Sequence, residues 1–169
     1  MMGLSIISLI FSTLIQGIIS NYLGYTHSEV TIFSSLYILI NLLILRPYFE
    51  NEKKYIILLI VFGLIVDIAF TNTFIFNTCL FLIIYYFSKF FHSFFPYNAI
   101  TLSISNLLGV FIYHILTFLI LSILKYDSYS VSVLLKILSH SIFMTIIYSC
   151  LVHGVVQQIQ NKLELRMVK

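Results

Sequence analysis

Residues 55–89 read YIILLIVFGLIVDIAFTNTFIFNTCLFLIIYYFSK, an almost wholly apolar stretch in which Asp67 is the only charged residue before Lys89. A chain that crosses hydrocarbon must pair its own backbone hydrogen-bonding groups, either as a helix or as a closed barrel. The unbroken apolar runs lack the alternation that barrel strands require. The stretch therefore predicts two membrane helices joined by a tight hairpin at the polar segment TNTFIFNT.

The composition of the whole chain points the same way. The 169 residues are 60% hydrophobic and 9% charged, whereas soluble domains carry about 25% charged residues. The mean hydropathy is +1.06, so nearly every residue outside a few short patches needs an apolar environment. We predict an all-α integral membrane protein that forms one domain over residues 1–169.

Charge and cysteine usage exclude two other classes of protein. The net charge is +3, but the basic residues are scattered at the ends of apolar segments, which indicates membrane topology and not a nucleic-acid surface. Cys79 and Cys150 each lie inside an apolar run without a CxxC partner. This spacing predicts neither a disulfide scaffold nor a zinc site.

Polar punctuation divides the chain into six predicted helices. They span about residues 2–22, 30–45, 55–70, 76–91, 99–124 and 133–157. The second, third and fourth are shorter than the ~20 residues that a crossing normally takes, so a count of five stays open. The aromatic row YYFSKFFHSFFPYN, residues 85–98, predicts a belt at the level of the lipid headgroups.

The distribution of basic residues predicts the orientation. With the N-terminus inside, the outer segments hold only Lys125 and Lys136. The cytoplasmic segments hold the others: Arg46, Lys53, Lys54, Lys89, Lys162, Arg166 and Lys169. An excess of basic residues marks the cytoplasmic side. We therefore expect both termini in the cytoplasm, which an even number of crossings requires.

The presence of Asp67 in an apolar helix needs an explanation, because a carboxylate in the bilayer centre costs roughly 2.5–3.5 kcal/mol on insertion scales. A rise of 1.5 Å per residue puts it roughly 18 Å along its helix, in the same layer as His114 and His140. Three interpretations are open. Asp67 caps its own helix end or bonds to residues 71–73, it pairs with a histidine, or the three side chains bind a metal ion.

Two further residues are candidates for helix packing. Gly63 lies one helical turn before Asp67, where a small residue lets a neighbouring helix come close. Asn106, with Ser103 and Ser105 nearby, predicts interhelical hydrogen bonds. Enzymatic motifs such as G-x-S-x-G, H-E-x-x-H and a Walker A loop are missing from the sequence. We expect a protein that is not an enzyme, with no cofactor and no bound metal.

The segment VFGLIVDIAFTNTFIFNTCLFLIIYYFSKFF resembles the MreD family, the rod shape-determining membrane proteins of the bacterial cell-wall elongation machinery. In that family a helix carries a glycine four residues before an aspartate, as Gly63 and Asp67 stand here. A polar turn follows, here residues 71–73. The next helix then ends in aromatic and basic residues, here residues 85–89.

The resemblance covers the whole length of the chain, including the uncharged first helix, the basic loop before the third helix and the short basic tail. One position departs from the family pattern. The family often has a glycine in the turn before an asparagine or similar residue, whereas Ile75 and Phe76 precede Asn77 here.

The resemblance implies a non-enzymatic scaffold of the bacterial inner membrane that binds MreC directly. It also implies a wider complex with MreB, RodZ, RodA and a class B penicillin-binding protein, which controls cell shape and lateral peptidoglycan synthesis. The implied fold is that of the substrate-binding subunits of energy-coupling-factor transporters, and homodimerisation is left open. Two alternatives remain: such a vitamin-transporter subunit itself, or a proton-coupled carrier that uses Asp67 and the histidines.

Overall fold

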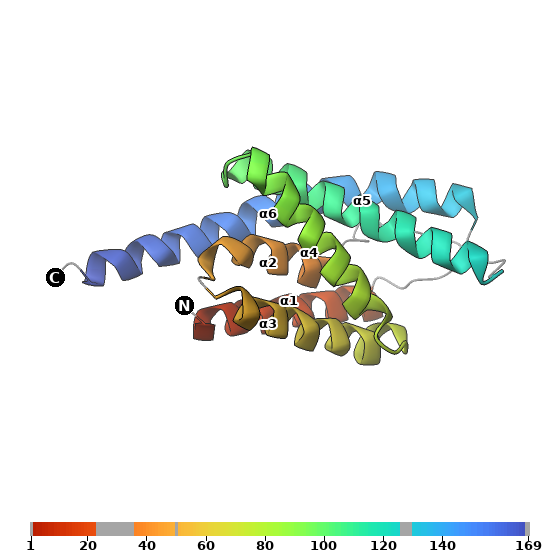
Figure 1. Ribbon diagram of the computed structural model, residues 1–169, viewed down its shortest axis with the longest axis horizontal. Helices are drawn as coiled ribbons and strands as arrows, with labels where there is room; N and C mark the ends of the chain where they lie inside the picture. The colour runs from red at the N-terminus through yellow and green to blue at the C-terminus, as the bar shows by residue number, and fades with distance from the viewer. Residues whose placement is uncertain (1, 23–35, 50, 126–129, 168–169) are drawn as a thin grey trace.

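The computed structural model describes residues 2–22, 36–49, 51–125 and 130–167, and these residues form helices and short connections without a strand (Figure 1). The α-helices are α1 (Met2–Tyr22), α2 (Tyr37–Leu45), α3 (Glu52–Val66), α4 (Phe76–Phe94), α5 (Ala99–Ile123) and α6 (Val131–Met167). A 3-10 turn, η1 (Arg46–Tyr48), follows α2, and a π-helical turn, η2 (Asp67–Thr71), follows α3. For these described residues, the all-α class and the count of six α-helices are confirmed.

Within the described ranges, three helical segments are long and apolar enough to cross a membrane. They are Glu52–Thr71, Ala99–Ile123 and Val131–Ile159, and two shorter apolar segments cover Ser5–Ile19 and Tyr37–Tyr48. Large apolar side chains such as Phe11, Ile68 and Ile123 point outward from the bundle. An outer surface of this kind suits lipid, in which exposed apolar side chains carry no hydration cost.

The helix bounds follow the predicted ones closely for the first, fourth and fifth helices. The first half of the predicted second helix, residues 30–35, lies outside the described residues, and the described part begins at Tyr37. The last helix is much longer than predicted, since it continues to Met167 and not to residue 157. Residues 155–167 contain neither proline nor glycine, so nothing in the sequence breaks the helix after it leaves the apolar region.

The short helix α2 lies at the centre of the bundle. All nine of its residues are buried, and it contacts α1, α4, α5 and α6 (Figure 1). A helix that is apolar all round is expected in this position because it has no face to offer to water. Its one amide, Asn41, donates hydrogen bonds to the backbone oxygen and the hydroxyl of Ser8, both at 2.9 Å, and to the hydroxyl of Ser12 on α1.

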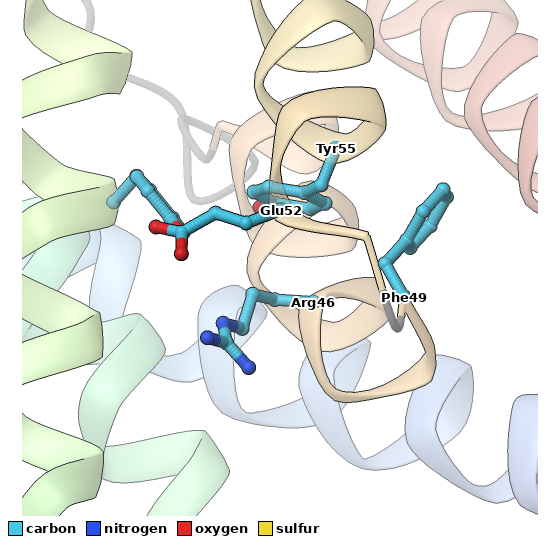
Figure 2. Close-up of a pocket in the computed structure, with 5 residues that line it drawn as sticks. Arg46, Phe49, Glu52 and Tyr55 are labelled. Carbon is cyan, nitrogen blue, oxygen red and sulfur yellow. The ribbon is translucent and has the colours of Figure 1, made fainter.

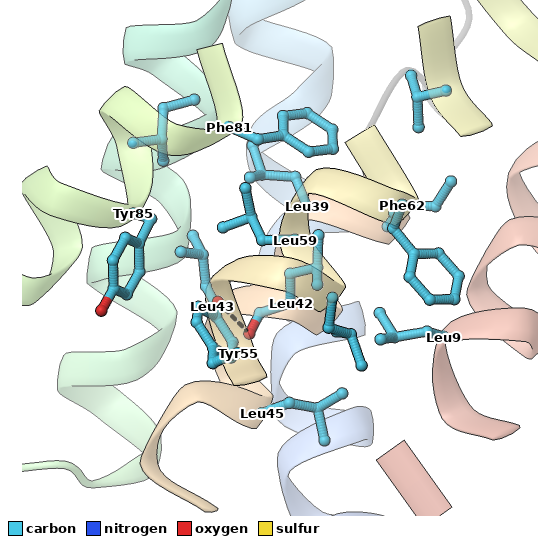
Figure 3. Close-up of a cluster of buried hydrophobic side chains, with 14 of the residues drawn as sticks. Leu9, Leu39, Leu42, Leu43, Leu45, Tyr55, Leu59, Phe62, Phe81 and Tyr85 are labelled. Atoms are coloured by element: carbon cyan, nitrogen blue, oxygen red, sulfur yellow. Dashed lines mark hydrogen bonds between the residues drawn. The ribbon is translucent and has the colours of Figure 1, made fainter. Parts of the chain in front are cut away.

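The main apolar core lies between α2, α3 and α4 (Figure 3). Leu42, Leu59 and Phe81 are almost completely buried there. The hydroxyl of Tyr55 donates a hydrogen bond to the backbone oxygen of Leu42 at 2.9 Å, which satisfies its polar end inside the core. This core fixes the start of α3 against α2 and thereby orients the α3–α4 hairpin.

The helices α5 and α6 run antiparallel and close the other side of the bundle (Figure 1). Asn106 on α5 donates a hydrogen bond to the hydroxyl of Ser149 on α6 at 3.0 Å, and both residues are buried. Ser141 and Thr145 precede Ser149 at intervals of four residues and are also buried. Small residues at this spacing let the two helices approach each other.

Candidate functional site

Asp67 lies where the helical backbone of α3 widens into the π-turn η2, and its side chain is 0% exposed. The widened turn closes at Asn72, whose φ of 49° is left-handed. The backbone N–H of Thr73 then returns to the oxygen of Asp67 at 3.0 Å. The chain reverses within a few residues, so the start of α4 comes to lie beside the carboxylate.

Both carboxylate oxygens of Asp67 accept hydrogen bonds from the turn and from α4. Oδ1 accepts from Oγ1 of Thr73 at 2.6 Å and from the backbone N and Nδ2 of Asn77 at 2.8 and 3.0 Å. Oδ2 accepts from the backbone N and Oγ1 of Thr78 at 3.1 and 2.8 Å. A carboxylate offers about four lone-pair sites, so these hydrogen bonds leave the Asp67 carboxylate no free site for a further donor.

Asp67 therefore caps the first turn of α4, although it belongs to the preceding helix. The residue in the N-cap position, Ile75, has no side-chain hydrogen bond to offer. The backbone N–H groups of Asn77 and Thr78, which have no partner within α4, donate their hydrogen bonds to the Asp67 carboxylate instead. A negative charge at a helix N-terminus is favourable because it faces the positive end of the helix dipole.

A second layer of hydrogen bonds holds Asn77 in place. Its Nδ2 also donates to Oγ1 of Thr71 at 2.8 Å, and Oγ1 of Thr71 lies 2.7 Å from Oγ1 of Thr73. The hydroxyl of Tyr113 on α5 donates to Oδ1 of Asn77. The network around Asp67 thus extends from the α3–α4 hairpin to a third helix.

Gly63 permits this arrangement through its lack of a side chain. A Cβ built on Gly63 would lie 2.8 Å from both the Cα and the Oγ1 of Thr78. Real Cβ atoms do not approach a backbone atom so closely, and α3 and α4 would have to separate to admit one. The close contact brings Thr78 within hydrogen-bonding distance of Asp67, one helical turn further along α3.

The histidines proposed as partners of Asp67 do not bond to it. Nδ1 of His140 lies 2.8 Å from the backbone oxygen of Lys136 on its own helix. His114 is buried, and its Nε2 has no hydrogen-bond partner among the described residues. Within the described ranges there is also no group of three or more His, Cys, Asp or Glu residues placed to hold a metal ion.

Of the three interpretations of Asp67, the geometry fits the structural one, with a difference in detail. Asp67 bonds to Thr73 as that interpretation allows, but it caps the helix that follows and not its own. Because its oxygens are occupied by donors of the hairpin, the carboxylate is not free to accept a substrate proton or a metal ion. Its role here is to join α3 to α4.

Several members of this network were not singled out from the sequence. Thr78 follows Asn77 directly, and Tyr113 precedes His114, so each is the neighbour in sequence of a residue that the sequence analysis named as a candidate. Outside this network, Asn41 is the only amide in the apolar run 36–45, and Ser8 and Ser12 are spaced by one helical turn. That spacing is the signal that could have found the α1–α2 contact.

Hollows in the surface are also lined by described residues. A cavity of about 120 Å³ is bordered by Arg46, Phe49, Glu52, Tyr55 and Tyr85 (Figure 2). An apolar groove of about 280 Å³ lies between α5 and α6 and is lined by Ala99, Ile100, Ser103, Ile104, Leu107, Ile146 and Cys150. Both are smaller than the ~300–1,000 Å³ typical of sites for small organic ligands.

Comparison of the chain with models of protein families, with curated proteins and with solved structures finds no match.

Proposed function

We propose that this chain is a non-enzymatic membrane scaffold of the MreD type, which binds MreC and takes part in the control of bacterial cell shape and lateral peptidoglycan synthesis. The observation that carries the proposal is the Gly63–Asp67–Thr78 contact. The only acid within the apolar part of α3 and η2 has all its hydrogen bonds inside the α3–α4 hairpin. These bonds support a structural role for the Asp67 carboxylate, as a scaffold requires.

The geometry of the α3–α4 hairpin explains why the MreD-like residues occur at their positions in the sequence. The glycine four residues before the aspartate is needed because Thr78 lies against it. The polar turn is needed because Thr71 and Thr73 bond to Asp67 and Asn77. A family that depends on this hairpin would require these residue types at this spacing, which supports the resemblance.

The proposed partners follow from the resemblance and from the outer surface. MreC is the direct partner, with MreB, RodZ, RodA and a class B penicillin-binding protein in the wider complex. Exposed apolar side chains on α1, including Ile7, Phe11 and Leu14, offer a surface to a membrane helix of a partner or of a second copy.

The proposed location is the bacterial cytoplasmic membrane, with several crossings and both termini in the cytoplasm. The start of α1 and the end of α6 lie toward the same end of the long axis of the molecule (Figure 1). Lys53 and Lys54 begin α3 as exposed residues, and basic residues favour the cytoplasmic side.

The second candidate is a substrate-binding subunit of an energy-coupling-factor vitamin transporter. This function would require a polar and aromatic pocket that holds a vitamin. The cavity beside Arg46 is only about 120 Å³, and the larger groove is about 280 Å³ with an apolar lining. These two hollows do not offer such a pocket, and the hydrogen bonds of Asp67 argue against a proton-coupled carrier.

The experiment that separates these candidates is affinity purification of the tagged chain from its native membrane in mild detergent. Co-purifying proteins and small molecules are identified by mass spectrometry. Recovery of MreC with wall synthases supports the scaffold. Recovery of paired ATPase subunits together with a bound vitamin contradicts it and makes the transporter subunit the leading candidate.

A further inference from the structure

Three charged side chains from η1, α3 and α4 lie at one end of the bundle. Arg46 stands at the start of η1, Glu52 at the start of α3 and Lys89 near the end of α4. Arg46 and Glu52 border the cavity of about 120 Å³ together with Tyr55 and Tyr85. Figure 2 shows the guanidinium of Arg46 beside the open space under the Glu52 carboxylate. The cavity is therefore lined mainly by polar groups.

The single carboxylate of this cluster is shared. Oε1 of Glu52 accepts a hydrogen bond from the hydroxyl of Tyr85 at 2.7 Å and also pairs with Nζ of Lys89. Among the described residues, Glu52 is the only acid that lines the cavity. In the part of the chain that the structure describes, this one carboxylate faces two cations, Arg46 and Lys89, so their charges favour an anion at the cavity.

The cavity is accessible from outside and large enough for a small anion. The side chain of Glu52, which borders the cavity, is 43% exposed, and so is that of Lys89, which pairs with Glu52 beside the cavity. The buried rings of Tyr55 and Tyr85 form its inner wall. A water molecule takes about 30 Å³ in the liquid, so the volume of about 120 Å³ admits a group the size of phosphate.

The position of the cavity suits a phosphate at a membrane surface. It lies where α2 ends and α3 begins, next to the end of α4. That end of α4 exposes Phe90 and Phe94, and Phe95 and Tyr97 follow directly. Exposed aromatic side chains of this kind lie at the level of lipid headgroups. The cavity therefore opens at the level where phosphate groups are concentrated.

We propose that this cavity binds a phosphate group, as a headgroup of an anionic phospholipid or as a free phosphate. The planar guanidinium of Arg46 is suited to two parallel hydrogen bonds to phosphate oxygens. Lys89 and the hydroxyl of Tyr85 supply further donors from α4, and Glu52 competes with the ligand for both. This site is independent of the proposed scaffold function.

Glu52 provides the sharpest test because the two interpretations of the cluster predict opposite results. If the cluster is only an ion pair that joins α3 to α4, Glu52→Gln weakens the contact and creates no affinity for anions. If the cavity binds phosphate, Glu52→Gln removes the competing negative charge. It frees Lys89 and Tyr85, and phosphate then binds more tightly.

The experiment uses the full chain in a mild non-ionic detergent. Binding is titrated by native mass spectrometry with dihexanoyl phosphatidylglycerol, dihexanoyl phosphatidylcholine and inorganic phosphate. The wild type is compared with Arg46→Gln, Glu52→Gln and the control Lys53→Gln. The control removes a neighbouring exposed positive charge that does not line the cavity. Thermal unfolding of each variant shows that it is folded.

We expect phosphatidylglycerol to bind more tightly than phosphatidylcholine, whose choline group neutralises the phosphate. Arg46→Gln weakens the binding about tenfold, as the loss of one charged contact implies. Glu52→Gln strengthens it several-fold, and Lys53→Gln changes it by less than about twofold. Equal binding of phosphatidylglycerol and inorganic phosphate identifies a free phosphate as the ligand, and preference for the lipid identifies the headgroup.

Three results would overturn the proposal. The first is that folded wild type binds neither phosphatidylglycerol nor inorganic phosphate. The second is that Lys53→Gln weakens binding as much as Arg46→Gln, which indicates attraction to a basic surface without a site. The third is that Glu52→Gln fails to strengthen binding, and this result decides the question even if Arg46→Gln does not fold.

Discussion

Gly63 on α3 faces Thr78 on α4 so closely that a Cβ on residue 63 would lie 2.8 Å from the Cα of Thr78. We predict that Gly63→Ala forces the two helices apart and weakens the bonds from Thr78 to Asp67. Overpacking of this kind costs about 1–3 kcal/mol. The expected result is a lower midpoint of thermal unfolding in detergent.

Gly154→Ala is the matched control for this change. Gly154 also lies within a helix, α6, but a Cβ there would meet nothing within 4 Å. Its unfolding midpoint should equal or exceed that of the wild type, because alanine is the better helix former by up to about 1 kcal/mol. Equal losses in the two variants would contradict a special role of the Gly63 contact.

Asp67→Asn tests the capping of α4. The asparagine side chain keeps one acceptor but places an NH₂ group among donors, so one of the groups around it, such as the backbone N–H of Thr78, loses its partner. An unsatisfied buried donor costs about 1–3 kcal/mol. We expect a corresponding loss of stability, measured by thermal unfolding, while the conservative Thr78→Ser, which keeps the hydroxyl, loses less.

The same variant distinguishes a structural carboxylate from a transporting one. If Asp67 carried protons, Asp67→Asn would leave the fold unchanged and abolish solute uptake in reconstituted vesicles. An Asp67→Asn protein with wild-type stability would therefore argue against the capping role.

Ile75 is a site where a substitution should stabilise the protein. Its φ of 64° is left-handed, a conformation that costs an L-residue about 1–2 kcal/mol. The side chain is 40% exposed, so Ile75→Gly removes this strain with a limited loss of packing. We expect a higher unfolding midpoint. The position belongs to the turn in which the MreD-like pattern often has a glycine.

Phe74→Gly is the control for Ile75→Gly. Phe74 lies in the same turn and is 84% exposed, but its φ is not positive. The substitution removes a large exposed side chain without relieving strain, so the unfolding midpoint should stay the same or fall. A rise as large as that of Ile75→Gly would refute the strain argument.

Asn41→Leu tests the contact between α1 and α2. The amide donates to Ser8 and Ser12 from the interior of the bundle. Interhelical hydrogen bonds in membrane proteins contribute about 0.6–1.7 kcal/mol, and we expect a loss of this size in thermal unfolding. Thr13→Ala is the control, because Thr13 donates only to the backbone oxygen of Leu9 in its own helix. Equal effects would contradict a role of Asn41 in the contact.

The sequence predicted the helices well because hydropathy measures directly which segments avoid water. It also drew attention to Asp67, since an acid in an apolar run needs a partner. It could not identify that partner from height alone. The rise per residue placed Asp67, His114 and His140 in one layer, but each residue also turns by about 100° around the helix axis, so equal heights do not imply facing side chains.

The π-turn after Val66 could not be predicted from the sequence patterns, for a different reason. Hydropathy reports on burial and carries no information on which backbone oxygen each N–H selects. The turn is held by hydrogen bonds such as those from the backbone N–H groups of Asn77 and Thr78 to the Asp67 carboxylate, which form only when α4 has folded back against α3. For the same reason the capping of α4 by a residue of the preceding helix could not be derived from local capping rules, which look for the cap at Ile75.

The central position of α2 has a consequence for the order in which the protein is assembled. Its residues Ile40 and Ile44 are covered by Leu102 and Val110 of α5 and by Val152 of α6, all of which leave the ribosome later. The burial of α2 is therefore completed only after the second half of the chain has been synthesised. The hydrogen bonds of Asp67, by contrast, all lie within the α3–α4 hairpin and can form once α4 has been synthesised.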